Sequence, residues 1–164
     1  MPHIHTPRNT TLHAANDPQL PWSPRGTVDR QFIHMMEMFR PTGGLAPIAE
    51  VRYWLQDGTG PSEQPLDRWI QSRAVICIGW QSQQWLPWFQ FSRKTRAPHV
   101  QLRCLLDELG QVHQPWETAR WFAQANPWLG DRPPEQCLLS DLPGVLHAAC
   151  ADSVIANGEA RVCK

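Results

Sequence analysis

The sequence predicts a mainly α-helical protein with one β-hairpin, an α+β fold. Apolar residues recur at helical spacing through most of the chain, whereas one stretch carries two β-branched and aromatic runs around a polar turn. The expected architecture is a degenerate winged-helix-like N-terminal part followed by a small C-terminal helical bundle. Three regions follow: an extended, poorly ordered arm over 1–27, a helix–helix–helix–hairpin region over 28–97, and a C-terminal helical domain over 98–164.

The spacing of apolar residues defines the elements of the N-terminal half. Residues 1–27 contain five prolines and no sustained apolar period, so they are expected to stay extended. Apolar residues then recur every three or four positions over 28–39, and Thr27 is the expected N-cap of this helix. The same spacing predicts two further helices, over 46–60 and 65–74.

The hairpin is predicted over residues 74–91. Two β-branched and aromatic runs, AVICIGW and WLPWFQF, flank the polar turn QSQQ. Because proline cannot donate a hydrogen bond to a neighbouring strand, Pro87 is expected to place the second strand at the edge of its sheet. Helices followed by a hairpin are also the order of a small winged helix-turn-helix, in which the hairpin is the wing.

The C-terminal half is expected to be helical after a polar, basic linker over 92–99. Apolar spacing predicts helices over 98–110, 114–126, 133–139 and 140–158. The last helix is expected to begin at Ser140 or Asp141 and to stop at Gly158. Its buried face is expected to hold Leu142, Val145, Leu146, Ala149 and Val154.

A rigid corner is predicted where residues 114–126 give way to the next helix. Asn126-Pro127 ends the helix, and Asn126 tolerates the left-handed conformation of a C-cap. Gly130 permits a tight turn, and Trp121-Phe122 place two aromatic rings on adjacent helix faces. Such a corner suits protein binding because a rigid surface loses little conformational entropy on binding. The alternative is that these rings only close the helical core.

Charge and composition argue against several classes of function. The formal net charge is zero, from 15 basic and 15 acidic residues. This balance weakens a nucleic-acid-binding function, because affinity for phosphate comes mainly from Lys and Arg. No apolar run approaches the roughly 20 residues of a membrane span, so no membrane contact is expected. With no signal-peptide pattern and five cysteines without a CxxC spacing, we expect a cytoplasmic protein with reduced thiols.

No pattern of catalytic or metal-binding residues stands out. The sequence has no GxSxG, no Gly-rich phosphate loop and no HExxH. None of the seven histidines stands at a zinc-like spacing from Cys, Asp or Glu. We therefore expect no catalytic residue, no metal site and no cofactor, and hence a protein that is not an enzyme.

The corner motif resembles a known family. The C-terminal toxin-binding domain of the Xre/MbcA/ParS antitoxins has a tryptophan-rich helix, a corner of Asn, Leu, Gly and Pro, and a final helix that ends near a glycine. The matching positions here are Trp116, Ala119, Trp121, Phe122, Asn126, Pro127, Leu129, Gly130, Arg132 and Pro133. The upstream run over 85–91 is similar to the strand that precedes this domain, so the resemblance covers about 85–158, half of the chain.

The resemblance implies a protein that neutralises a toxin encoded by an adjacent gene. That toxin would be of the RES type, an enzyme that degrades NAD or transfers ADP-ribose, so NAD would belong to the partner. Family members close the toxin's active site with the corner and the C-terminal tail. A homodimer of this protein is a further expectation. The implied partner-binding residues are Trp121, Asn126, Trp128, Leu129, Arg132, Pro133, Asn157, Gly158 and Arg161.

A DNA-binding transcriptional regulator, which could repress its own operon, is the alternative. Residues 65–74 would be the recognition helix, and basic residues follow the hairpin. The candidate DNA-binding residues are Arg68, Gln71, Arg73, Arg93, Lys94 and Arg96. The zero net charge and the aromatic composition of the hairpin argue against this function, because a wing rich in Trp and Phe usually packs on its own domain.

Overall fold

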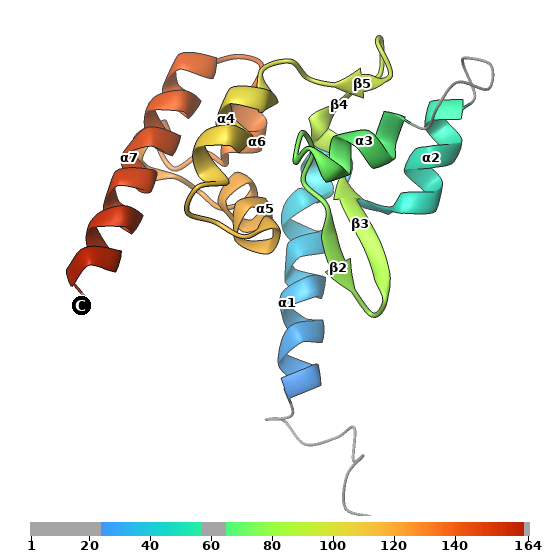
Figure 1. The fold of residues 1–164 in the computed structure, drawn as a ribbon, viewed down its shortest axis with the longest axis horizontal. Coiled ribbons are helices and arrows are strands. Elements are labelled where there is room, and N and C mark those ends of the chain that lie inside the picture. Colours follow the sequence, from blue (N-terminus) through green and yellow to red (C-terminus); the bar gives the residue numbers. More distant parts are fainter. Residues whose placement is uncertain (1–23, 57–64, 163–164) are drawn as a thin grey trace, which may run out of the picture.

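The protein is mostly helical with a small antiparallel sheet (Figure 1). This computed structural model describes residues 24–56 and 65–162. The first half contains α1 (Pro24–Phe39), η1 (Arg40–Thr42), β1 (Leu45–Pro47), α2 (Ile48–Gln56), α3 (Pro65–Gln71), β2 (Ile78–Trp80), β3 (Gln83–Pro87), η2 (Trp88–Gln90) and β4 (Phe91–Ser92). The second half contains β5 (Ala97–Pro98), α4 (Leu102–Leu109), α5 (Pro115–Ala123), η3 (Pro127–Leu129), α6 (Pro134–Cys137) and α7 (Leu142–Val162).

The predicted hairpin is confirmed as β2 and β3, but the prediction that Pro87 marks an edge strand is wrong. The strand order is β1-β3-β2, so β3 is the central strand. β2 pairs with β3 only as far as Trp85, and Pro87 lies opposite Leu45 of β1. The N–H of Trp88 then donates to the carbonyl of Gly44 at 3.0 Å, so the ladder passes the proline without using its missing donor. β1 was not predicted, and two of its three residues fall at the start of the stretch expected to be helix 46–60.

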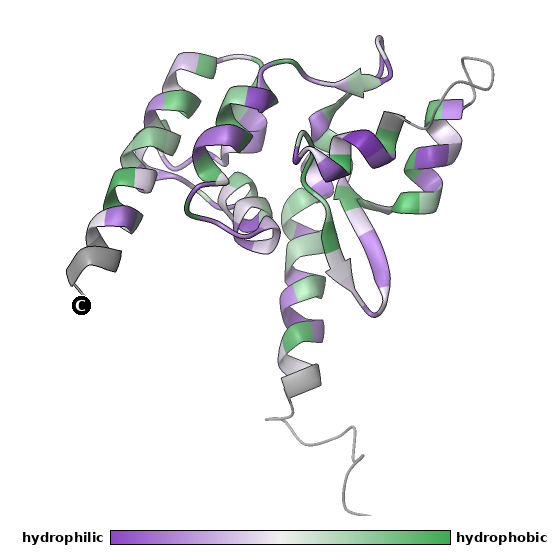
Figure 2. Ribbon diagram, in the orientation of Figure 1, coloured by the Kyte–Doolittle hydropathy of each residue, from purple (hydrophilic) through white to green (hydrophobic). Residues whose placement is uncertain are grey.

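The hairpin turn has an uncommon composition. Gln81 and Ser82 form its two-residue loop, with φ of 46° and 61°. Positive φ at both central residues is the mark of a type I′ turn, where Asn and Gly are usually preferred. The turn itself is hydrophilic (Figure 2). Next to the turn, the ring of Trp80 stacks on Phe32 of α1 with centroids 4.0 Å apart, so the hairpin packs on its own protein, as expected from its aromatic composition.

Several helix ends differ from their predicted positions. α1 begins at Pro24, so Thr27 lies within the helix and is not its N-cap. α7 continues to Val162, because Gly158 keeps a helical backbone and does not adopt the positive φ of a C-cap glycine. Its start is as predicted: Asp141 is the N-cap, and its Oδ1 accepts a hydrogen bond from the N–H of Gly144 at 3.1 Å. Residues 1–23 of the predicted arm lie outside the described residues.

The predicted linker and the helix after it also differ from expectation. Within 92–99, Ser92 pairs with Ala97 in a short ribbon of β4 and β5. The helix expected over 98–110 therefore begins only at Leu102, after that ribbon and a turn. Its end is close to the prediction, at Leu109 and just before Gly110.

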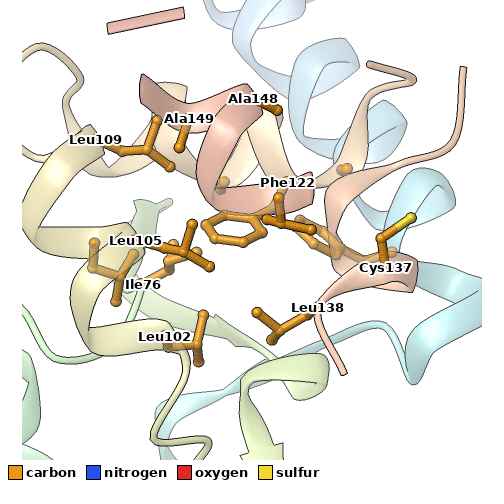
Figure 3. Close-up of a cluster of buried hydrophobic side chains, with 14 of the residues drawn as sticks. Ile76, Leu102, Leu105, Leu109, Phe122, Cys137, Leu138, Ala148 and Ala149 are labelled. Atoms are coloured by element: carbon orange, nitrogen blue, oxygen red, sulfur yellow. The ribbon is translucent and has the colours of Figure 1, made fainter. Parts of the chain in front are cut away.

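Two hydrophobic cores hold these elements. In the larger core, Leu102, Leu105 and Leu109 of α4 meet Phe122 of α5 and the small residues of α7 (Figure 3). This core also contains buried residues of α1, of the segment that leads into β2 and of β2 itself, namely Phe32, Met35, Phe39, Ile76 and Ile78. The smaller core is built by β1, α2, α3, the segment after α3, β3 and β4 from Ala46, Val51, Leu55, Leu66, Val75, Leu86 and Phe91. The larger core thus takes residues from both sides of the boundary predicted between 97 and 98.

Membrane spans and cysteine pairing can be described over the same residues. None of the helices within the described ranges is long and apolar enough to cross a membrane. The described cysteines, Cys77, Cys104, Cys137 and Cys150, are free thiols.

Candidate functional site

The corner between α5 and α6 is organised by Asn126. This residue is extended, with φ of −116°, and does not adopt the left-handed C-cap conformation expected from sequence. Its side-chain Oδ1 accepts a hydrogen bond from the N–H of Trp128 at 2.9 Å. Its carbonyl accepts from the N–H groups of Leu129 and Asp131 at 3.0 and 3.1 Å, and its own N–H donates to the carbonyl of Arg132 at 3.2 Å. A buried asparagine therefore fixes the backbone of the whole turn.

Asp152 of α7 ties this turn to the rest of the bundle. Its Oδ2 accepts a hydrogen bond from the indole N–H of Trp121 at 2.7 Å and another from Nδ2 of Asn126 at 3.0 Å. Both donors are in a half-buried environment, where bonds to a charged acceptor are stronger than in water. The Trp121 ring is further held edge-on against Phe122, with centroids 5.0 Å apart. One carboxylate on α7 therefore fixes both the end of α5, through Trp121, and the turn after it, through Asn126.

The ring of Trp128 is exposed on the turn that Asn126 and Asp152 hold in place. It is 52 % exposed and meets His147 of α7 edge-on, with ring centroids 5.4 Å apart. Positions 147, 151, 154 and 155 share one face of α7 by helical spacing, and Val154 and Ile155 on it are exposed. α7 carries hydrophobic residues along much of its length (Figure 2). We call Trp128, His147, Val154 and Ile155 the corner surface.

The residues predicted to bind a partner divide into two groups. Trp121, Asn126, Leu129 and Pro133 are buried or half-buried and support the corner from within. Trp128, Arg132, Asn157 and Gly158 are exposed. The Nε–H of Arg132 donates to the carbonyl of Leu129 at 3.1 Å, which aligns its stem along the turn. The backbone of Arg161 belongs to α7, but its side chain lies outside the described residues.

Sequence reasoning missed part of this site. Val154 was expected on the buried face of α7 but is 71 % exposed, because the buried face follows Val145, Ala148, Ala149 and Ser153 instead. Asp152 was also missed. A carboxylate on a helix usually faces solvent, and its two donors lie 31 and 26 residues away in the chain, so no local pattern indicates them.

Glu135 is a second unexpected carboxylate beside the corner, in the first turn of α6. It is buried, and its Oε2 accepts a hydrogen bond from the hydroxyl of Thr42 at 2.9 Å. No described residue bonds its buried Oε1. Burial raises the pKa of Glu135 to about 7, although the hydrogen bond from Thr42 acts in the opposite direction. The junction of α6 with η1 therefore contains a carboxyl group whose pKa lies near neutral pH.

The candidate DNA-binding residues are dispersed over α3, the segment after it and the turn between β4 and β5. Arg68 and Gln71 are exposed on α3, Arg73 follows the end of that helix, and Arg93 and Lys94 are exposed in the turn between β4 and β5. Arg96 is held differently: its guanidinium donates to the carbonyl of Trp54 at 3.0 Å and lies 5.9 Å from that ring. The hairpin turn contributes no charge, since residues 81–84 are Gln-Ser-Gln-Gln.

Metal binding and similarity to known proteins give no further assignment. Within residues 24–56 and 65–162, no group of three or more His, Cys, Asp or Glu side chains is arranged to hold a metal ion. In the comparisons with known proteins, no family model, no curated protein and no solved structure matches the chain.

Proposed function

We propose that the protein is an antitoxin-like binding module whose corner surface docks another protein. The observation that carries the proposal is the half-exposed Trp128 ring on a backbone fixed by Asn126 and Asp152. A rigid tryptophan loses little conformational entropy on binding and offers a large apolar area, which is why tryptophan is frequent among dominant interface residues. Val154 and Ile155 extend the apolar area, and exposed Arg132 and Asn157 supply a polar rim.

The partner class follows from the resemblance of the corner to the Xre/MbcA/ParS antitoxins. We propose that the partner is a toxin encoded by a neighbouring gene, of the RES type that degrades NAD or transfers ADP-ribose. In this proposal the chain carries no chemistry of its own and acts by covering the partner's active site. NAD is then the toxin's substrate.

Co-expression with the product of the adjacent gene tests this function. We expect the two proteins to co-purify, and Trp128→Ala to weaken the complex by about 30-fold or more, as expected for an interface residue that contributes at least about 2 kcal/mol. Tyr53→Ala is the matched control, because Tyr53 is an aromatic residue that is 74 % exposed on α2, outside the corner surface. Failure to co-purify, or equal effects of both substitutions, contradicts the proposal.

Self-association at the same surface is tested by a separate experiment. Sedimentation of the isolated protein shows whether a second copy occupies the corner surface. Suppose that the protein is a dimer, that Trp128→Ala dissociates it, and that the neighbouring gene product does not bind. The partner at the corner surface is then a second copy of the chain and not a toxin.

DNA binding remains a second candidate, supported by the order of elements. α2 and α3 are followed directly by the β2–β3 hairpin, which is the order of a winged helix-turn-helix, and Arg68 and Gln71 are exposed on α3. Retardation of the gene's own promoter fragment at low salt, lost in the Arg68→Ala/Gln71→Ala double variant, would support it. Unchanged mobility of the fragment at low salt excludes it. An autoregulatory antitoxin would satisfy both candidates.

A further inference from the structure

A pocket of about 180 Å³ lies between the two cores, away from the corner surface. Its lining comes from the end of α3, the segment that leads into β2, one residue of β3, the end of α4 and the beginning of α5. The walls include Ile70, Val75, Ile76 and Leu106, so most of the lining is apolar. A pocket with apolar walls and a few polar groups is the usual form of a small-molecule site.

The polar groups of this pocket favour an anion. Arg73 and His113 line it beside the uncharged Gln84 and Thr118, and none of its lining residues is acidic. Nε2 of His113 is buried and has no hydrogen-bond partner among the described residues. A buried polar atom without a partner is costly, so a ligand that bonds Nε2 would gain free energy there. The lining thiol of Cys77 stays neutral, because burial raises its pKa.

Arg73, one of the lining residues, holds an unfavourable backbone conformation. Its φ is 54°, directly after α3, where its N–H donates to the carbonyl of Ile70 at 3.1 Å and the N–H of Ala74 donates to Trp69 at 2.8 Å. This is the C-terminal position at which glycine is usually found, because other L-residues are strained there. Strained residues often mark a functional site. Because Arg73 is a lining residue, an arginine in place of glycine puts an exposed cationic residue beside the pocket.

We propose that this pocket binds a small organic acid, with its carboxylate on Arg73, a hydrogen bond to His113 and its apolar body against Ile70, Val75, Ile76 and Leu106. A planar guanidinium matches a carboxylate with two parallel hydrogen bonds. The small volume and apolar walls suit a monoanion with a compact apolar body. The proposal does not depend on the corner surface or on any partner protein.

Benzoate is the probe that tests this site, and benzyl alcohol is its neutral counterpart. In the full-length protein, we expect benzoate to shift the backbone amide signals of Val75, Ile76 and Thr118 saturably, with an affinity at least about tenfold above that of benzyl alcohol. Arg73→Gln should remove this preference. Arg93→Gln is the matched control, because Arg93 is exposed and is not part of the pocket lining.

Arg73→Gly separates binding from folding. The substitution relieves the strained backbone and removes the guanidinium, so we expect it to abolish the preference for benzoate and to raise the melting temperature by about 2–4 °C. Shifts that do not saturate, equal affinity for both probes, or wild-type benzoate binding by Arg73→Gly overturn the proposal. A lowered melting temperature of Arg73→Gly also overturns it, because Arg73 would then serve the fold.

Discussion

The β2–β3 hairpin and the corner after α5 both carry several aromatic residues, but different forces hold them in place. In the hairpin, ring packing dominates: Trp80 stacks on Phe32 at 4.0 Å, and Trp85 meets Phe32 edge-on at 5.1 Å. In the corner, hydrogen bonds to Asn126 and Asp152 fix the backbone, and Trp128 stays 52 % exposed. An aromatic side chain can therefore remain exposed at a surface when hydrogen bonds to polar side chains, and not packing of the ring, fix the local backbone.

The largest expected effect tests the ring packing of the hairpin. Trp80→Ala removes the ring that stacks on Phe32 and the indole N–H that donates to Asp29 at 3.1 Å. We expect a loss of about 3 kcal/mol in the free energy of unfolding, at the lower end for a buried tryptophan because Trp80 is only half-buried. Urea denaturation measures it. Trp128→Ala should cost less than about 1 kcal/mol, and equal losses for the two variants would remove the contrast between hairpin and corner.

The second prediction concerns the polar frame of the corner. Asp152→Ala leaves the indole N–H of Trp121 and Nδ2 of Asn126 without their acceptor, and Asn126 is buried. Leaving buried donors unpaired costs about 1–3 kcal/mol each, so we expect a destabilisation of about 2–3 kcal/mol by urea denaturation.

Asp107→Ala is the control for this substitution. Asp107 also accepts a hydrogen bond on a helix, from Arg103 at 3.0 Å, but both side chains are 59 % exposed. An exposed pair contributes about 0–1 kcal/mol. If Asp152→Ala is as mild as Asp107→Ala, hydrogen bonds do not hold the corner.

The third prediction concerns the pH dependence of stability beside the corner. Burial raises the pKa of Glu135 from its usual 4.5 to about 7. The folded protein therefore keeps a proton that the unfolded chain releases above about pH 4.5. Stability from this group is fully present below that pH and is lost as pH rises through about 7.

Glu135→Gln should abolish this part of the pH dependence, because an amide does not titrate. Between pH 4.5 and 8, we expect the wild type to lose on the order of 2 kcal/mol more than the variant. Denaturant titrations across this range measure the difference in slope. Glu50→Gln, at an exposed position of α2, should keep the wild-type slope. Parallel curves for wild type and Glu135→Gln would mean that the carboxylate is solvated.

Much of this fold is predictable from local patterns. The helical spacing of apolar residues in 98–110 and 140–158 located α4 and α7, and two aromatic runs located the hairpin. β1 could not be seen, because its three residues lead directly into α2 and become a strand only by pairing with β3. The same non-local pairing decides whether β3 is central or at the edge, and Pro87 by itself does not.

The site was predictable only in outline. Asn126, Gly130 and Pro133 indicate a tight turn through local chemistry, and Gly130 indeed has a positive φ of 64°. The exposure of Trp128, in contrast, depends on Asp152 and His147, which come from a helix that packs beside the turn. Which of two neighbouring tryptophans faces solvent is a property of tertiary contacts, and sequence spacing does not contain it.

The smallest expected effect is a gain of stability in the hairpin turn. Gln81 and Ser82 occupy a type I′ turn with positive φ, where residues other than Gly, Asn and Asp are strained. The double substitution Gln81→Asn/Ser82→Gly should therefore raise the free energy of unfolding by about 1 kcal/mol, read as a higher urea midpoint at unchanged slope. Thr95→Gly is the control: Thr95 lies in the exposed turn between β4 and β5 and has no positive φ, so this substitution should give no gain in stability. No gain in the hairpin variant would mean that the packing of Trp80 and Trp85 on Phe32 alone sets the stability of the hairpin.

A gain in stability that also strengthens DNA binding would instead indicate that this turn acts as a wing.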